Sequence, residues 1–209
     1  MSANLKKTAL AVASNLVNPV LALMWALFAA STYLAWRQTH SVVALLLFFV
    51  NTLFAVLFVS RRSSRAVSEN PKDWMVTAAT ILLSFTLRVK PVSVLPLIAV
   101  SQAVQAVSVT IILFSLCALG RSFGLIPANR GVKTGGMYHY VRHPLYAGEL
   151  LFYLGFLVGN FSVFNAVVCA CIFLGLNLRA GAEERLLKGD RSYLDYMRRV
   201  RFRFIPGLF

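Results

Sequence analysis

Apolar residues occupy long, nearly uninterrupted segments of the chain, and polar residues collect in the short stretches between them. Most of these segments approach the roughly 20 residues that an α-helix needs to cross a hydrocarbon layer about 30 Å thick. Helices are favoured because backbone groups inside a bilayer must form their hydrogen bonds within the segment itself. The pattern predicts membrane spans at residues 14–36, 41–60, 74–88, 97–119, 145–159 and 162–178.

Two features of this pattern affect the span count. Segment 74–88 is short for a span and is followed by Lys90 and Pro91, so five spans are an alternative to six. The last two segments are joined only by Gly159-Asn160-Phe161-Ser162, which predicts a tight helical hairpin.

Composition also indicates a membrane protein, with a single domain expected over residues 1–209. Of the 209 residues, 58% are apolar and only 13% are charged, which is too little polar surface to cover a soluble domain. The formal net charge is +14, but the basic residues lie between the spans, where they set topology and contact anionic lipid headgroups. No nucleic-acid-reading motif appears, so we expect no nucleic-acid partner.

The positive-inside rule gives the expected orientation. With six spans and both termini in the cytoplasm, 18 of the 21 Lys and Arg residues are cytoplasmic, the exceptions being Arg37, Arg88 and Lys90. An odd number of spans would remove this asymmetry. The predicted fold class is therefore all-α: a polytopic integral membrane protein with about six transmembrane helices and cytoplasmic N- and C-termini.

Ionisable residues divide the chain into two parts. The first four spans contain almost none, whereas Arg, Tyr, Gly and Glu are frequent from Gly120 onward. We expect residues 1–120 to form a transmembrane scaffold and residues 121–209 to carry the chemistry. The three cysteines and three histidines show no metal-ligand spacing, so no metal site is expected.

The fifth span begins beside a first group of candidate residues. Pro144 suits the first turn of a helix, whose N-terminus presents free N–H groups and the positive end of the helix dipole. Tyr146, Glu149 and Tyr153 share one face of that helix, and His143 lies one turn earlier. A carboxylate inside the membrane boundary is unfavourable, so Glu149 marks a functional site; the alternative is that this end only anchors the helix to headgroups.

A second group lies where the sixth span ends. On a continuing helix, Arg179 and Glu183 are i, i+4 neighbours, and so are Glu184 and Lys188. A carboxylate at this position can bind two ribose hydroxyls or an ammonium group. An arginine can bind a carboxylate through two parallel hydrogen bonds. The alternative is a pair of surface ion pairs, each contributing about 0.3–0.5 kcal/mol. Residues 193–206 interleave aromatic and basic side chains, as in a segment on an anionic membrane surface, and their tyrosines are also candidates to close over a cofactor.

Together these motifs resemble the isoprenylcysteine carboxyl methyltransferase family and the related phospholipid methyltransferases. The resemblance covers roughly residues 115–209, and it is carried by Gly136-x-Tyr138, Arg142-His143-Pro144-x-Tyr146-x-Gly148, Glu183-Glu184, and closing Tyr-x-x-Tyr and Arg-x-x-Pro patterns. It implies S-adenosylmethionine as methyl donor, with S-adenosylhomocysteine as product, in a pocket facing the cytoplasm. It also implies a lipophilic acceptor that enters from the bilayer, through a tunnel shaped by residues 1–120.

The resemblance assigns roles to individual residues. Arg179 and Glu183 are the expected catalytic residues, with Arg179 orienting the acceptor or its carboxylate. The expected cofactor-binding residues are Tyr138, Arg142, His143, Pro144, Tyr146, Gly148, Glu149, Glu183 and Glu184.

The expected function is a membrane S-adenosylmethionine-dependent methyltransferase, most readily a carboxyl O-methyltransferase acting on a prenylcysteine-type carboxylate. Methyl transfer from a sulfonium is an in-line displacement that requires alignment and a dry pocket, and a carboxylate is already ionised at neutral pH. Another lipid carboxylate, an amine headgroup or a lipophilic small molecule are alternative acceptors. An NADPH-dependent sterol or enone reductase and a non-catalytic membrane protein are the alternative classes; two adjacent glutamates would repel the polyphosphate of NADPH.

Overall fold

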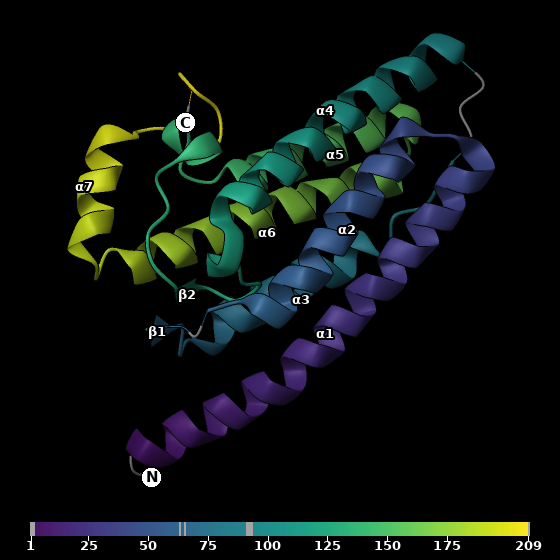
Figure 1. Ribbon diagram of the computed structural model, residues 1–209. Helices are drawn as coiled ribbons and strands as arrows, with labels where there is room; N and C mark the ends of the chain where they lie inside the picture. The colour runs from purple at the N-terminus through teal and green to yellow at the C-terminus, as the bar shows by residue number, and fades with distance from the viewer. Residues whose placement is uncertain (1–2, 63, 65, 91–93, 209) are drawn as a thin grey trace. The chain divides into compact units, whose positions relative to one another are not determined.

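The computed structural model describes residues 3–62, 64, 66–90 and 94–208, with the backbone alone for residues 3–17. This part of the chain contains seven α-helices and one two-stranded pairing, so the predicted all-α class is confirmed (Figure 1). The α-helices are α1 (Ala3–Thr39), α2 (Val42–Ser60), α3 (Pro71–Ser84), α4 (Leu95–Leu119), α5 (Pro144–Gly159), α6 (Val163–Leu187) and α7 (Arg191–Arg199). Two short 3₁₀ helices, η1 (Gly120–Ser122) and η2 (Gly136–His139), lie in the connection from α4 to α5.

The chain forms two compact units, residues 1–61 and 62–209. In the first unit, α1 and α2 pack against each other as a helical hairpin. Ser41 caps α2 by accepting a hydrogen bond from the backbone N–H of Ala44. Trp25 of α1 stacks on Phe54 of α2 with ring centroids 4.3 Å apart. This unit contains none of the predicted site residues.

In the second unit, α4 packs on α5, α3 packs on α6, and α5 also contacts α6. Small residues allow the close approaches. A Cβ added at Gly155 would lie 3.0 Å from side-chain atoms of Val104 and Gln105 on α4, and one at Gly159 would lie 2.5 Å from the Ser101 hydroxyl. The Gly-x-x-x-Gly spacing at 155–159 therefore serves helix packing.

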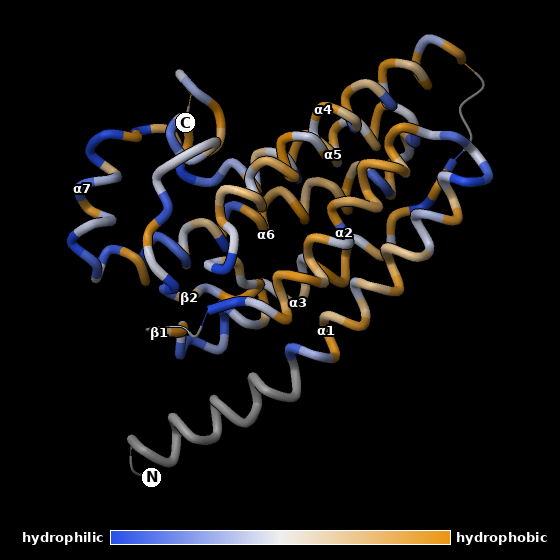
Figure 2. The backbone as a smooth tube through the Cα atoms, viewed as in Figure 1, coloured by the Kyte–Doolittle hydropathy of each residue, from blue (hydrophilic) through white to orange (hydrophobic). Residues whose placement is uncertain are grey.

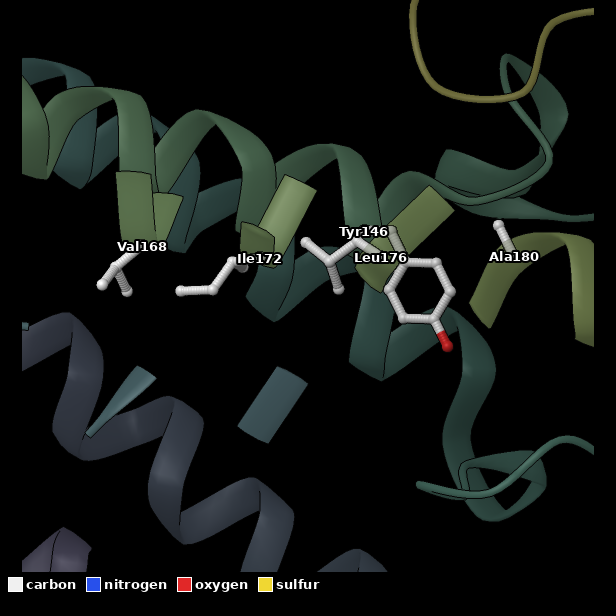
Figure 3. Close-up of a cluster of buried hydrophobic side chains, with 5 residues drawn as sticks. All are labelled: Tyr146, Val168, Ile172, Leu176 and Ala180. Carbon is white, nitrogen blue, oxygen red and sulfur yellow. The ribbon is translucent and has the colours of Figure 1, made fainter. Parts of the chain in front are cut away.

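A row of apolar side chains on α6 forms the core of the second unit. Val168, Ile172, Leu176 and Ala180 repeat every four residues and so share one face of the helix. Figure 3 shows Tyr146 of α5 at the Leu176 and Ala180 end of this row. The polar residues of the candidate site begin at that end of the core.

Four helices in the described part of the chain are long and apolar enough to cross a membrane: Asn18–Thr39 within α1, Val42–Ser60, Leu95–Ser122 and Val163–Leu187. Apolar residues dominate α2, α4 and α5, whereas α7 is largely polar (Figure 2). On the outer faces of α4 and α6, Phe114 and Leu174 are each 60% exposed, as suits lipid contact. The polytopic arrangement predicted from sequence is therefore supported by four spans.

The other two predicted spans are helices, but they are shorter than a full crossing. α5 has 16 residues. α3 has 14, and it occupies Pro71–Ser84 instead of 74–88 because Asn70 caps its start and a tight turn at Phe85 ends it. After that turn, the backbone N–H and carbonyl of Arg88 both bond the Asn165 side chain on α6, at 3.1 and 2.9 Å.

The connection between α4 and α5 contains a pairing that the sequence pattern did not predict. Strand β1 (Ala66–Val67) precedes α3, and it pairs antiparallel with β2 (Ala128–Asn129). Two-residue strands carry no readable periodicity, which is why the pattern missed them. The pairing fixes the loop before α5 against the start of α3.

Candidate functional site

The C-terminal segment crosses over the start of α5. The backbone N–H groups of Arg142 and His143 donate hydrogen bonds of 2.9 Å to the carbonyl oxygens of Phe202 and Arg203. Pro144 follows as the first helical residue of α5, where its missing N–H needs no partner. The Arg-His-Pro motif is therefore a fixed turn, held on one side by α5 and on the other by residues 202–203.

Glu184 of α6 joins three parts of the chain at this turn. Its carboxylate accepts hydrogen bonds from Arg142 Nε at 3.0 Å and from Arg203 Nη2 and Nε at 2.7 and 3.2 Å. His143 Nε2 lies 3.2 Å from the same carboxylate. Glu184 is only 3% exposed, and a buried carboxylate requires such partners. Its oxygens are therefore engaged by the turn before α5 and by the C-terminal segment.

The neighbouring Glu183 has a different environment. The Tyr146 hydroxyl donates a hydrogen bond to one of its oxygens, and His143 Nδ1 lies 3.7 Å from the other. The His143 and Tyr146 rings are parallel, with centroids 5.7 Å apart and an interplanar angle of 5°. Glu183 keeps 24% of its side chain exposed. It is thus the glutamate of the pair whose carboxylate remains partly accessible to a ligand.

Arg179 lies one helical turn before Glu183 and is 6% exposed. Its guanidinium carbon lies 5.0 Å from the centre of the Tyr146 ring, a cation–π contact, and its Nη2 donates to the Leu125 carbonyl at 3.2 Å. Within the described part of the chain its Nε is buried and has no hydrogen-bond partner. A buried donor without an acceptor is rare and unfavourable, so this N–H marks a position for a ligand oxygen.

Glu149 completes the group on the α5 side. Its carboxylate interacts electrostatically with Arg179 and Glu183, and it makes no hydrogen bond or ion pair to any residue that the structure describes. The predicted i, i+4 ion pairs within α6 do not form among these residues, because Arg179 turns to Tyr146, and Glu184 turns to other arginines instead of Lys188.

Tyr196 holds the loop before α5, which contains Tyr138, and both tyrosines lie outside the candidate spans. The Tyr196 hydroxyl of α7 donates to the carbonyl oxygens of Tyr138 and Val141, at 2.6 and 3.3 Å. Burial raises the pKa of Tyr138 well above its usual value of 10, and the nearby Glu183 carboxylate raises it further. The phenol of Tyr138 therefore stays neutral and lies near the carboxylates of the site.

The structure brings most predicted site residues together. Tyr146, Glu149, Arg179 and Glu183 converge between α5 and α6, with His143 beside them. Gly148 instead faces α4, where an added Cβ would lie 2.7 Å from Ile112 Cγ1. Sequence reasoning missed the Leu125 carbonyl and the role of Arg203, although the Arg-x-x-Pro pattern contained that arginine.

Long apolar helices with a buried group of ionisable side chains at one end of the core define a helical membrane protein with an internal polar site. Residues 89–189 match the family model described as phospholipid methyltransferase. This segment is just under half of the chain, and it includes α4, α5, α6 and all the predicted site residues. The part of the chain that carries the site is therefore similar to the phospholipid methyltransferase family of membrane methyltransferases, which confirms the resemblance drawn from the motifs. No curated protein matches the chain.

Proposed function

We propose that the protein transfers a methyl group from S-adenosylmethionine to a lipophilic acceptor that carries a carboxylate, such as a prenylcysteine. The observation that carries this proposal is the arrangement around Tyr146. The guanidinium of the buried Arg179 lies over the ring, its Nε has no hydrogen-bond partner among the described residues, and the Glu183 carboxylate lies at the hydroxyl. A cationic donor and an anionic acceptor both find groups of opposite charge there. The family match supports methyl transfer over the reductase and non-catalytic alternatives.

The residues present fit the cofactor. Its sulfonium and its ammonium are both cations, and such groups suit carboxylates and the faces of aromatic rings. Glu149 and Glu183 supply the carboxylates, and Tyr138 and Tyr146 supply rings close to them. Glu183 would hold the ribose hydroxyls or the ammonium, since its carboxylate is partly exposed.

The remaining predicted cofactor residues would act by holding the pocket in shape. Arg142 and Glu184 bond each other and the C-terminal segment, so we propose that they position His143 and close the pocket. Pro144 would set the start of α5, and Gly148 would let α5 approach α4 closely.

When bound, S-adenosylmethionine supplies a methyl group on a positively charged sulfur; transfer to a carboxylate oxygen forms an O–CH₃ bond, breaks the S–CH₃ bond and leaves a neutral thioether and a methyl ester. No proton moves, so the chain needs to supply alignment and exclusion of water, not a base. Arg179 would hold one oxygen of the acceptor carboxylate and direct the other toward the methyl group. The apolar row of α6 would exclude water from one side.

An amine headgroup is the second candidate acceptor, and Glu149 favours it. An ammonium must lose a proton before its nitrogen can attack, and the Glu149 carboxylate, with no hydrogen-bond partner in the described chain, would accept that proton. A carboxylate acceptor would use Arg179 and give a methyl ester, whereas an amine acceptor would use Glu149 and give an N-methyl product. The chemistry of the product therefore distinguishes the two acceptors.

We also propose that the predicted topology holds, with six crossings and both termini in the cytoplasm. The distribution of basic residues supports it, since 18 of 21 then lie on the cytoplasmic side. α3 and α5 would be the short crossings, and the site would face the cytoplasm.

The test uses purified protein in detergent with methyl-labelled S-adenosylmethionine and three acceptors: a farnesylated cysteine derivative, phosphatidylethanolamine and a total lipid extract. A methyl ester releases labelled methanol in alkali, whereas an N-methyl product keeps its label. We expect alkali-labile label on the prenylcysteine. Glu183→Gln should weaken S-adenosylhomocysteine binding at least about tenfold, the loss expected for a hydrogen bond to a charged group, whereas the exposed control Glu69→Gln should not. Thermal stabilisation by NADPH and not by S-adenosylhomocysteine would reject the proposal.

A further inference from the structure

A groove of about 260 Å³ lies between α3 and α6, and the site described above does not account for it. From α3 it is lined by Lys72, Asp73 and Val76, and from α6 by Leu178, Arg179 and Arg185. Each wall of the groove therefore presents an apolar residue, Val76 or Leu178, and most of the polar lining is charged.

The charges in the groove are predominantly positive. Its only carboxylate in the described lining, that of Asp73, is already engaged by the Ser68 hydroxyl at 2.5 Å and by Arg185 Nη2 at 3.0 Å. Lys72 is exposed and makes no ion pair with any residue in the described part of the chain. The start of α3 adds the positive end of its helix dipole. An anion would meet complementary charge here.

Arg179 belongs both to this groove and to the group of residues around Tyr146. It is 94% buried, and its Nε has no partner among the described residues. Glu149 and Glu183 also interact with Arg179 and oppose an anion, but neither lines the groove. The groove thus leads from two exposed cations to one buried donor that lacks an acceptor.

We infer that this groove binds the single anionic headgroup of an amphiphile, a carboxylate or a phosphate, with Val76 and Leu178 contacting the first methylene groups. Arg179 would receive an oxygen of the headgroup, and Lys72 and Arg185 would attract it to the mouth. That this ligand is the methyl acceptor rests on the proposed function, but the binding of the anion does not. The acceptor would then enter between α3 and α6.

The test is equilibrium binding by calorimetry without S-adenosylmethionine, using purified protein in a neutral maltoside detergent. The probes are dodecanoate, dodecyl phosphate, the cation dodecyltrimethylammonium and inorganic phosphate. We expect both anionic amphiphiles to bind, inorganic phosphate to bind much more weakly because it lacks the chain, and the cation not to bind.

Two variants locate the site. Lys72→Gln combined with Arg185→Gln should weaken dodecyl phosphate binding by about five- to tenfold, as expected for two exposed charges. Arg191→Gln removes an exposed cation of α7 that does not line the groove, so it should leave binding unchanged. Lys72→Gln alone should also weaken dodecyl phosphate binding. It changes one exposed side chain and leaves the Arg185–Asp73 pair intact.

Equal loss in the control and the double variant, or equal binding of the anionic and cationic amphiphiles, would overturn the inference. S-adenosylhomocysteine binding, measured in the same samples, separates the two proposals. Anion binding without cofactor binding would reject the proposed function and retain the groove. Binding of S-adenosylhomocysteine without any preference for anionic headgroups would reject the groove and retain the proposed function.

Discussion

The Glu184 carboxylate of α6 and the Arg203 guanidinium of the C-terminal segment meet side by side, with two N–H groups on two carboxylate oxygens at 2.7 and 3.2 Å. This fork-to-fork geometry is the strongest form of an arginine–carboxylate pair. Arg203 also donates to the Asn177 side chain at 2.9 Å, so it is fixed along α6 at two points. The pair attaches the segment after α7 to the end of α6 that carries Arg179 and Glu183.

Replacing Glu184 by glutamine should therefore destabilise the protein. The change leaves Arg142 and Arg203 without their anion in a largely buried place, which costs about 3 kcal/mol. Thermal unfolding in detergent should report a lower midpoint, and limited proteolysis should cleave the segment after Val200 sooner. Arg201→Gln is the matched control, because the Arg201 side chain is exposed. Unchanged stability in Glu184→Gln would show that the pair does not hold the segment.

Replacing Arg179 by alanine should lower turnover far more than it lowers cofactor affinity. Arg179 lines the groove and contacts the Tyr146 ring, so its loss removes the donor that we propose for the acceptor and keeps the carboxylates that we propose for the cofactor. We expect turnover to fall at least about a hundredfold, the size of effect seen when one positioned donor is removed from a reaction site.

The comparison for this prediction is Arg179→Lys, which keeps the charge but not the planar fork. It should recover only part of the turnover. S-adenosylhomocysteine affinity should change less than threefold in both variants. A larger loss of cofactor affinity than of turnover would assign Arg179 to the cofactor.

Two glycines give a matched pair for stability. An alanine Cβ at Gly148 would lie 2.7 Å from Ile112 Cγ1 and 3.2 Å from the Ile112 backbone nitrogen. We expect Gly148→Ala to destabilise the protein by about 1–3 kcal/mol through overpacking between α4 and α5. Gly181→Ala on α6 should instead stabilise it by up to about 1 kcal/mol, because its nearest atom is 3.7 Å away and alanine favours helix.

Unfolding in detergent measures both glycine variants. If Gly148→Ala kept full stability but lost cofactor affinity, Gly148 would contact the cofactor directly, as its place in the motif predicts. A loss of stability with unchanged affinity in the folded fraction would assign it to helix packing.

Tyr196 predicts a pH dependence at the alkaline end. Burial raises its pKa to about 12, against 10.0 for an ordinary tyrosine. Between these values the unfolded chain loses the proton while the folded chain keeps it. The stability that Tyr196 contributes is therefore complete below pH 10, declines from pH 10 to 12, and is absent above.

Tyr196→Phe measures this contribution. Below pH 10 the variant should be about 1–2 kcal/mol less stable, since it lacks the hydrogen bonds to the Tyr138 and Val141 carbonyls. The difference between the two proteins should shrink as pH rises from 10 to 12. Other tyrosines ionise in both proteins and cancel in the difference. A difference that stayed constant to pH 12 would contradict the prediction.

Sequence predicted the start of α5 well, because Pro144 is a strong local signal, and it placed Tyr146 and Glu149 on one face of that helix. α6 continues to Leu187, as the continuing helix considered for Arg179 and Glu183 requires, whereas the predicted membrane span ends at residue 178. The apolar run ends there, but the following Arg, Ala, Glu and Leu residues are good helix formers, so hydropathy marked the membrane and not the helix.

The contacts of the candidate site were harder to predict. Spacing alone suggests pairs between side chains that lie one turn apart on a helix. Glu184 instead forms ion pairs with Arg142 and Arg203, which are distant from it in the sequence. The Leu125 carbonyl reaches Arg179 from the loop before α5, and the short strand pairing that holds this loop has no sequence signal. The family motifs identified most of the site residues. Only the structure shows that the Glu184 carboxylate is bound by two arginines, whereas the Glu183 carboxylate is partly accessible.

The attachment of Arg203 to Glu184 also sets an order of events during biosynthesis. α1 and α2 precede Arg203 by more than 140 residues, so the translocon can insert them long before the ribosome adds Arg203. Until that residue emerges, Glu184 lacks its bidentate partner, and the Arg-His-Pro turn lacks the carbonyls that receive its N–H groups. The polar cluster therefore matures late, after insertion of the apolar helices, and a nascent chain stopped before residue 203 would lack both the Glu184–Arg203 pair and the backbone bond from His143 to residue 203.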